Sequence, residues 1–273
     1  MPHIKANGVT LFHELFGDSS RPTFVMTHGL GGHGRGYSEQ IEAFSQEFQL
    51  LLWDMRGYGQ SERVPVTEGA YSRWTHAADL SSLLTELDIG AAHIHGHSLG
   101  GLVSQQFALD YPEQTLSLVI QDTSAEIKQE FLDGWGDMLT TVREKGIGAL
   151  PNNPRRGWGD KYIAEHGDDI ERRRQETAER NAPQVYAEGV RISGPELSQR
   201  PIAPDLGRIA CPVLVICGDE DRTTPPGGLV RIHRAISQSR LVIIPGAGHF
   251  PNVETTERFN QEILAFLREA SAA

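Results

Sequence analysis

The sequence Gly96-His97-Ser98-Leu99-Gly100 lies between a strand-like run and a helix-forming pattern, and this pentapeptide decides the fold. The run before it is Ala92–His95, and the pattern after it is Leu102–Leu109. A serine on a sharp strand-to-helix turn needs small residues two positions before and after it, because larger side chains would clash there. Glycines occupy both positions, so we expect the turn to present Ser98 as a nucleophile. An ordinary glycine-rich turn would have the same letters, so the other parts of the chain must decide.

Mostly apolar, strand-like runs recur along the chain on both sides of this turn. Continuous hydrophobicity is typical of strands buried on both faces, as in a mostly parallel sheet covered by helices. The first run, together with His3–Ala6 and the turn Asn7-Gly8, predicts instead an antiparallel hairpin at the sheet edge. The runs are Thr10–Phe16, Thr23–His28, Gln49–Asp54, Ala92–His97, Leu116–Asp122, Val213–Asp219 and Arg240–Pro245.

Helical patterns alternate with these strands, which predicts an α/β fold. The alternation stops between residues 125 and 204, where charged, helix-prone stretches and Pro/Gly breaks replace the buried strands. We therefore expect a core made of residues 1–124 and 205–273, with a helical subdomain inserted at 125–204. The expected core helices are Tyr37–Phe48, Arg73–Leu87, Ser98–Tyr111, Gly227–Ile236 and Thr255–Leu267.

Composition excludes several classes of protein. The formal net charge is −11, which disfavours a nucleic-acid partner because such a partner requires a basic surface. The longest apolar runs fall far short of the ~20 residues of a membrane helix, and the first residues lack the pattern of a secretory signal. We expect a cytoplasmic protein that acts on a small molecule.

The two cysteines, Cys211 and Cys217, fall in one expected strand. Six residues of strand span about 20 Å, whereas a disulfide tolerates roughly 7 Å between Cα atoms. The two residues therefore cannot pair within that strand, and two thiols do not make a zinc site. We expect both to pack in the core.

A base and an acid follow Ser98 in the chain. Serine is a weak nucleophile that requires a base, and the base requires an acid to orient it. The sequence Gly218-Asp219-Glu220-Asp221 follows one expected strand and Gly248-His249 follows the next. Because open α/β proteins build their sites beyond the carboxyl ends of strands, we expect Ser98, an aspartate of this loop and His249 to meet there.

A glycine-rich loop, His28-Gly29-Leu30-Gly31-Gly32, follows the strand Thr23–Thr27. Glycines let backbone N–H groups turn toward a substrate oxygen. We expect the N–H groups of Leu30 and Leu99 to form an oxyanion hole.

Together these motifs resemble the α/β-hydrolase superfamily. The resemblance rests on the His28-Gly29 loop, Asp54–Ser61, the serine turn, Gly218–Asp221 and Gly248-His249, and it covers nearly all of the expected core. It implies a mostly parallel eight-stranded sheet flanked by helices, with a helical cap after the sixth strand. It also implies that Asp221 is the acid, with Asp122 as a competitor because some members place the acid after the sixth strand.

The function expected on these grounds is that of a serine hydrolase that cleaves a carboxylic ester or a lactone through an acyl-enzyme on Ser98. Neither a metal nor an organic cofactor is needed for this chemistry. Helical and aromatic residues of the insertion, with the residue after His249, are expected to line the substrate pocket. They are Trp135, Met138, Leu139, Trp158, Tyr162, Tyr186 and Phe250. Part of this set belongs to an apolar helical stripe, Phe131 to Val142, that packing of the insertion also explains.

Three alternatives remain. Carbon–carbon bond hydrolases use the same triad, but those that resemble this chain commonly carry Trp where Phe250 stands. The letters Gly29 to Gly34 also spell G-x-G-x-x-G, and Asp54 follows 20 residues later, which is the pattern of an NAD-dependent oxidoreductase. A ligand-binding relative without catalytic activity is the third.

Overall fold

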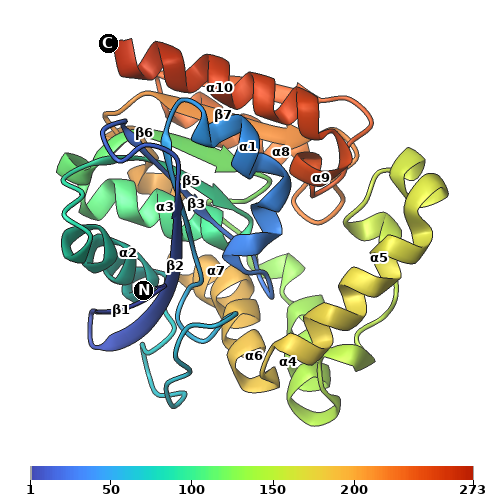
Figure 1. Cartoon of the computed structure of the whole chain (residues 1–273). Coiled ribbons are helices and arrows are strands. Elements are labelled where there is room, and N and C mark those ends of the chain that lie inside the picture. Colours follow the sequence, from blue (N-terminus) through green and yellow to red (C-terminus); the bar gives the residue numbers. More distant parts are fainter. Residues whose placement is uncertain (1, 273) are drawn as a thin grey trace.

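The computed structural model describes residues 2–272 and contains one eight-stranded sheet with the order β1-β2-β4-β3-β5-β6-β7-β8 (Figure 1). Strands β3 to β8 run parallel to one another, while β2 pairs antiparallel with both β1 and β4. The mostly parallel sheet expected from the sequence is therefore confirmed. The strands are β1 His3–Ala6, β2 Val9–Phe16, β3 Thr23–Thr27, β4 Gln49–Trp53, β5 Ala92–His97, β6 Thr115–Gln121, β7 Val213–Gly218 and β8 Ser239–Ile244.

The expected edge hairpin is present, because β1 and β2 pair through register partners such as Ala6 and Val9. Asn7 and Gly8 have φ values of +47° and +78°. Positive φ angles at both central residues define a type I′ turn, whose twist matches that of the two strands it joins. Asparagine and glycine tolerate these angles best.

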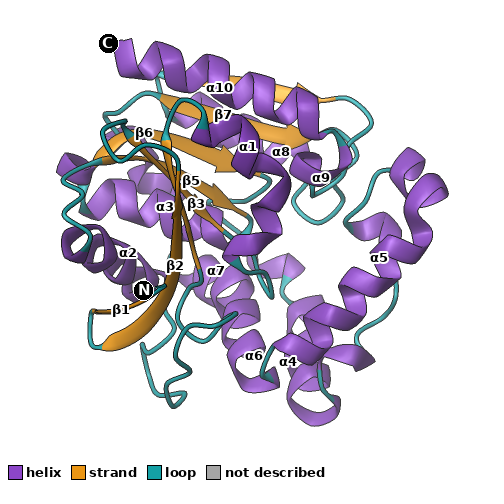
Figure 2. Ribbon diagram, viewed as in Figure 1, coloured by secondary structure: helices purple, strands orange, loops and turns teal. Residues whose placement is uncertain are grey.

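Helices cover both faces of the sheet (Figure 2). On one face α1 (Ile41–Ser45) and α10 (Thr256–Ala272) bury Phe44, Phe259 and Ile263 against side chains such as Met26. On the other face α2 (Arg73–Glu86), α3 (Leu99–Asp110) and α8 (Pro226–Ala235) pack against the neighbouring strand residues, among them Val25. Adjacent strand residues thus enter opposite cores, which explains why strands such as β4 and β7 carry continuous apolar runs rather than an alternating pattern.

Two expectations need correction. The helix expected at Tyr37–Phe48 is a 3-10 segment, Gly34–Gln40, followed by the short α1. Tyr37 interrupts the helical geometry at φ −104° and ψ 23°, and its hydroxyl donates to the Thr27 carbonyl 3.1 Å away.

Cys211 lies just before β7 and not within it, and the thiols of Cys211 and Cys217 are both free.

Between β6 and β7 the described residues form helices and loops without a strand, and we call residues 125–204 the β6–β7 segment. Its α-helices are α4 Asp133–Lys145, α5 Asp160–Arg180, α6 Pro183–Arg191 and α7 Leu197–Gln199. Figure 1 shows α4, α5 and α6 on one side of the molecule, whereas α7 lies nearer its middle.

Some residues of the apolar stripe on α4 form the segment's own small core. Val142 is fully buried and packs with Ile147 and Ala187, and Met138 and Leu139 lie against this cluster. Phe131 precedes α4 and is 64% exposed, so the stripe does not extend to it.

No helix within residues 2–272 is both long and apolar enough to cross a membrane.

Candidate active site

Ser98 lies on a sharp turn between β5 and α3, with φ +54° and ψ −115°. A Cβ at Gly96 would lie 2.1 Å from the Gly100 carbonyl oxygen, and a Cβ at Gly100 would lie 2.5 Å from the carbonyl oxygens of Thr27 and His28. The expected requirement for glycine at both positions is therefore confirmed. Such a backbone conformation is costly for serine, and strain of this kind concentrates at functional sites.

The loop after β7 holds Asp221 in a fixed position. Its Oδ1 accepts the N–H groups of Thr223 (2.7 Å) and Thr224 (3.1 Å), and its Oδ2 accepts the Thr224 hydroxyl at 2.6 Å. Asp221 is 2% exposed, so these bonds replace the water that the carboxylate has lost.

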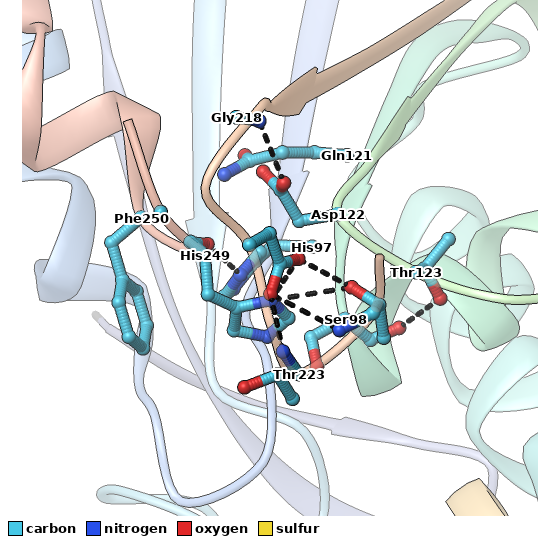
Figure 3. Close-up of polar contacts among 12 residues, drawn as sticks. His97, Ser98, Gln121, Asp122, Thr123, Gly218, Thr223, His249 and Phe250 are labelled. Atoms are coloured by element: carbon cyan, nitrogen blue, oxygen red, sulfur yellow. Dashed lines mark hydrogen bonds and ion pairs between the residues drawn. The ribbon is translucent and has the colours of Figure 1, made fainter. Parts of the chain in front are cut away.

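His249, in the loop after β8, pairs with that carboxylate. Its Nδ1 lies 2.8 Å from Asp221 Oδ2 and 3.3 Å from the Thr224 hydroxyl (Figure 3). Burial alone would raise the pKa of Asp221, but the charge of His249 and hydrogen bonds from His249 and Thr224 hold that pKa below its usual range. The carboxylate therefore stays ionised and fixes the tautomer of His249 that carries a proton on Nδ1, which leaves Nε2 free to accept one.

Ser98 belongs to the same cluster as His249, as Figure 3 shows. Its carbonyl accepts the Thr123 hydroxyl at 2.7 Å, and its N–H donates to the Gln121 carbonyl. Within residues 2–272 no hydrogen bond is found at Ser98 Oγ. The bond between a nucleophile and its base is often long in an unliganded enzyme and shortens when substrate binds.

Asp122, the competing acid, lies close to this pair without bonding to the histidine. Its Oδ1 accepts the Gly218 N–H at 3.0 Å, and its Oδ2 is buried without a partner. Burial and the charge of Asp221 raise the pKa of Asp122 well above its usual range. Carboxylate and ring atoms of Asp122, Asp221 and His249 lie within 4.8 Å of one another, a spacing that could hold a metal ion, but the hydrogen bond between Asp221 and His249 engages two of the three groups.

Leu30 and Leu99 come from two parts of the chain, the glycine-rich loop and the start of α3. Leu99 is the first residue of α3, where backbone N–H groups have no partner within the helix. In the described chain neither the Leu30 nor the Leu99 N–H donates a hydrogen bond. A Cβ at Gly189 of α6 would lie 2.4 Å from Leu30 Cδ1 and 3.2 Å from Leu99 Cδ2, so α6 packs directly over both leucines.

His28 shapes the glycine-rich loop. Its Nδ1–H donates to the Gly29 carbonyl at 2.8 Å, and its Nε2 accepts the Met55 N–H at 3.1 Å. Because the ring is buried, the pKa of His28 is lowered to about 4, and the neutral ring can serve as donor and acceptor at once.

The geometry disfavours the dinucleotide-binding alternative. Asp54 Oδ1 accepts the Gly34 N–H at 2.6 Å and its Oδ2 accepts the Gln60 N–H at 2.8 Å, so both oxygens hold backbone loops and neither is available for a ribose. The segment after Gly34 is a 3-10 turn rather than the long helix whose amino terminus binds a pyrophosphate.

Three residues expected to line a pocket form one aromatic stack beside the histidine. Trp158 stacks on Phe250 with a centroid distance of 4.5 Å and on Tyr162 with a distance of 5.0 Å. The ring of Phe250 lies 5.2 Å from that of His249.

The other four lie elsewhere in the β6–β7 segment, on α4 and α6. Tyr186 of α6 packs against Gly31 of the glycine-rich loop, since a Cβ at Gly31 would lie 2.9 Å from its ring. Trp135 packs against Gly194, at 2.5 Å from the position of a Cβ there. Met138 and Leu139 lie against the small core of the segment and are half-buried.

Sequence reasoning missed three residues that hold the site together: Thr224, His97 and Glu254. Thr224 could have been found, because a threonine shortly after an aspartate is a common turn in which the carboxylate accepts nearby N–H groups. His97 donates to the main chain of His249, and Glu254 accepts main-chain N–H groups. Nothing in the residue types at these two positions signals such contacts.

The chain is similar to several known hydrolases. The chain is 29% identical over 265 residues to 3-oxoadipate enol-lactonase 2 of Acinetobacter baylyi, covering 97% of this chain and 96% of that protein. The structure of an enol-lactonase from Burkholderia xenovorans superimposes with a TM-score of 0.87 at 25% identity, covering 98% of this chain and 100% of that one. A thermophilic esterase from Thermogutta terrifontis gives 0.86 at 28% identity, covering 99% of each chain. The profile of the alpha/beta hydrolase fold matches residues 22–256, and the chain therefore belongs to the α/β-hydrolase family.

Proposed function

We propose that this protein is a serine hydrolase that cleaves a carboxylic ester or a lactone through an acyl-enzyme on Ser98. One observation carries the proposal: a serine on a left-handed turn shares a cluster with a histidine whose Nδ1 lies 2.8 Å from a buried carboxylate. A histidine fixed in this way leaves its other ring nitrogen free to act as a base.

In the proposed mechanism the neutral ring of His249 takes the proton of the Ser98 hydroxyl as Oγ attacks the acyl carbon. The N–H groups of Leu30 and Leu99, which have no hydrogen-bond acceptor among residues 2–272, stabilise the negative charge on the substrate oxygen. His249 then gives its proton to the leaving alcohol, and the Ser98 ester forms. Water, deprotonated by the same histidine, attacks this ester. The acid is released as the bond to Ser98 Oγ breaks and His249 returns its proton to that oxygen, and Asp221 stabilises the protonated ring in both halves.

Three relatives support an ester or lactone bond as the substrate class, since two are named enol-lactonase and one esterase. Another, 28% identical to this chain, is named a putative carbamate hydrolase, which also acts on a carbonyl carbon. A carbon–carbon bond hydrolase on the same triad is the alternative. The resemblance to those enzymes is weakened at Phe250, where they commonly carry tryptophan.

We further propose that the β6–β7 segment is a cap over a small-molecule pocket. Its contact with the glycine-rich loop through Tyr186 and with the loop of His249 through Trp158 supports this role. The pocket wall is assigned to Trp135, Met138, Leu139, Trp158, Tyr162, Tyr186 and Phe250.

Hydrolysis of p-nitrophenyl esters of increasing acyl length, and of a series of lactones, tests this function. The wild type should turn over at least one series, and Ser98→Ala and His249→Ala should each lower kcat/KM by at least about 1,000-fold. Near-native turnover by either variant, with the fold retained by circular dichroism, would contradict the assignment.

A further inference from the structure

The main chain of His249 is held on both sides by residues distant in sequence. Its N–H donates to the carbonyl of Gly157 at 2.8 Å, and its own carbonyl accepts His97 Nε2–H at 2.8 Å. Gly157 belongs to the β6–β7 segment and His97 to β5. The position of the histidine therefore depends on a part of the chain outside the sheet.

A carboxylate joins these two parts. Glu254, at the end of α9 (Pro251–Glu254), accepts the N–H groups of Gly248 at 3.0 Å and Gly159 at 2.8 Å on Oε2, and that of Phe250 at 3.1 Å on Oε1. Gly248 and Phe250 are the neighbours of His249 on either side. One side chain thus fixes both ends of the loop that carries the histidine and ties it to the β6–β7 segment.

The two parts are in direct backbone contact around this carboxylate. A Cβ at Gly248 would lie 2.7 Å from the Gly157 carbonyl oxygen and 2.8 Å from the Gly159 nitrogen. The stack of Trp158 on Phe250 closes the other side. With so little free space, the loop cannot shift while the contacts to residues 157–159 remain.

Within residues 2–272, Glu254 accepts hydrogen bonds from backbone N–H groups alone and pairs with no cation. Three N–H groups aimed at two carboxylate oxygens match an ionised carboxylate, which accepts and never donates. A neutral amide can match only part of this set, since its NH2 would face an N–H donor.

We propose that Glu254 is a positioning residue for His249, and that through it the β6–β7 segment helps to set the geometry of the base as well as covering the site. This inference rests on the proposed function, in which His249 moves the proton. A base displaced by about 1 Å can cost 100-fold in rate. Loss of the carboxylate should therefore lower kcat by a larger factor than it changes KM, because Glu254 reaches the proposed pocket wall only through the backbone N–H groups of Gly159 and Phe250.

The experiment compares kcat and KM for one p-nitrophenyl ester in the wild type, Glu254→Ala, Glu254→Gln and Glu257→Ala. Glu257 is the matched control, an exposed glutamate three residues further along the chain. We expect kcat to fall about 30-fold or more in Glu254→Ala and less in Glu254→Gln, which keeps one acceptor oxygen. KM should stay within about threefold of the wild-type value, and Glu257→Ala should match the wild type. Thermal melts of each variant ensure that kcat and KM are measured well below its Tm. If Glu254→Ala does not fold, the kcat of Glu254→Gln tests the positioning role.

Two results would overturn the positioning role. One is a kcat within twofold of the wild-type value in the folded Glu254 variants, and the other is a rise in KM without a fall in kcat. Ser98→Ala, assayed in parallel, separates this outcome from failure of the proposed function. If Ser98→Ala is inactive and the Glu254 variants are fully active, only the positioning role fails; if Ser98→Ala is active, both fail.

Discussion

The loops that follow β6 and β7 each place an aspartate at the same end of the sheet, and their carboxylates differ in what surrounds them. Asp221 accepts three hydrogen bonds from Thr223 and Thr224 and pairs with His249. Asp122 accepts one, from the Gly218 N–H, and has an unpartnered oxygen. The number of donors, and not burial, decides which carboxylate can carry a negative charge next to the histidine, because both are buried.

The largest difference in kcat is expected between the two variants in which one of these aspartates is replaced by asparagine. Asp221→Asn removes the charge that orients and stabilises the ring of His249, so kcat should fall about 1,000-fold to 10,000-fold. Asp122→Asn keeps an oxygen for the Gly218 N–H and should change kcat less than about threefold. Steady-state kinetics on one ester checks both, and equal losses in the two variants would show that the loops share the acid role.

Removal of the Thr224 hydroxyl, which bonds to Asp221 and not to Asp122, should have an effect of intermediate size on activity. The hydroxyl donates to Asp221 Oδ2 at 2.6 Å, so Thr224→Val should lower kcat/KM about 10-fold while the backbone N–H bonds persist. Thr224→Ser restores the hydroxyl and should recover most of the loss. Failure of serine to recover activity would mean that the methyl group, and not the hydroxyl, matters at this position.

The smallest effect concerns stability at Asp122. Because the folded-state pKa of Asp122 is raised, its stabilising contribution is fully present below the unfolded pKa of about 4 and declines as pH rises above it. Asp122→Asn, which cannot ionise, should therefore raise Tm by about 2–4 °C at pH 7, on the order of 1 kcal/mol, with a smaller gain at pH 4.

Calorimetric or fluorescence melts at the two pH values measure this difference. A gain of the same size at pH 4 and pH 7 would show that ionisation of Asp122 is not its cause.

Much of the architecture could be predicted from the sequence, because parallel strands buried on both faces leave a direct signal. The runs Phe24–Met26 and Val213–Cys217 are continuously apolar, and the glycines around Ser98 report a close backbone approach. The helix expected at Tyr37–Phe48 was wrong because the tyrosine hydroxyl bonds to β3, a tertiary contact that local pattern does not contain.

The choice between Asp122 and Asp221 could not be made from residue types, since both follow a buried strand. The resemblance favoured Asp221, and the geometry agrees because only Asp221 bonds to His249. The role of Glu254 could not be predicted, because its partners are backbone N–H groups of Gly159 and of the histidine loop. Nearly every residue has such a group, so residue types do not reveal these contacts.

The most direct test of the central claim is labelling with a fluorophosphonate, which reacts only with an activated serine, followed by peptide mass spectrometry. The account predicts one label per chain at Ser98, slow labelling in Asp221→Asn, near wild-type labelling in Asp122→Asn and none in Ser98→Ala. Absence of labelling in the wild type, or labelling that persists in Ser98→Ala, would contradict it.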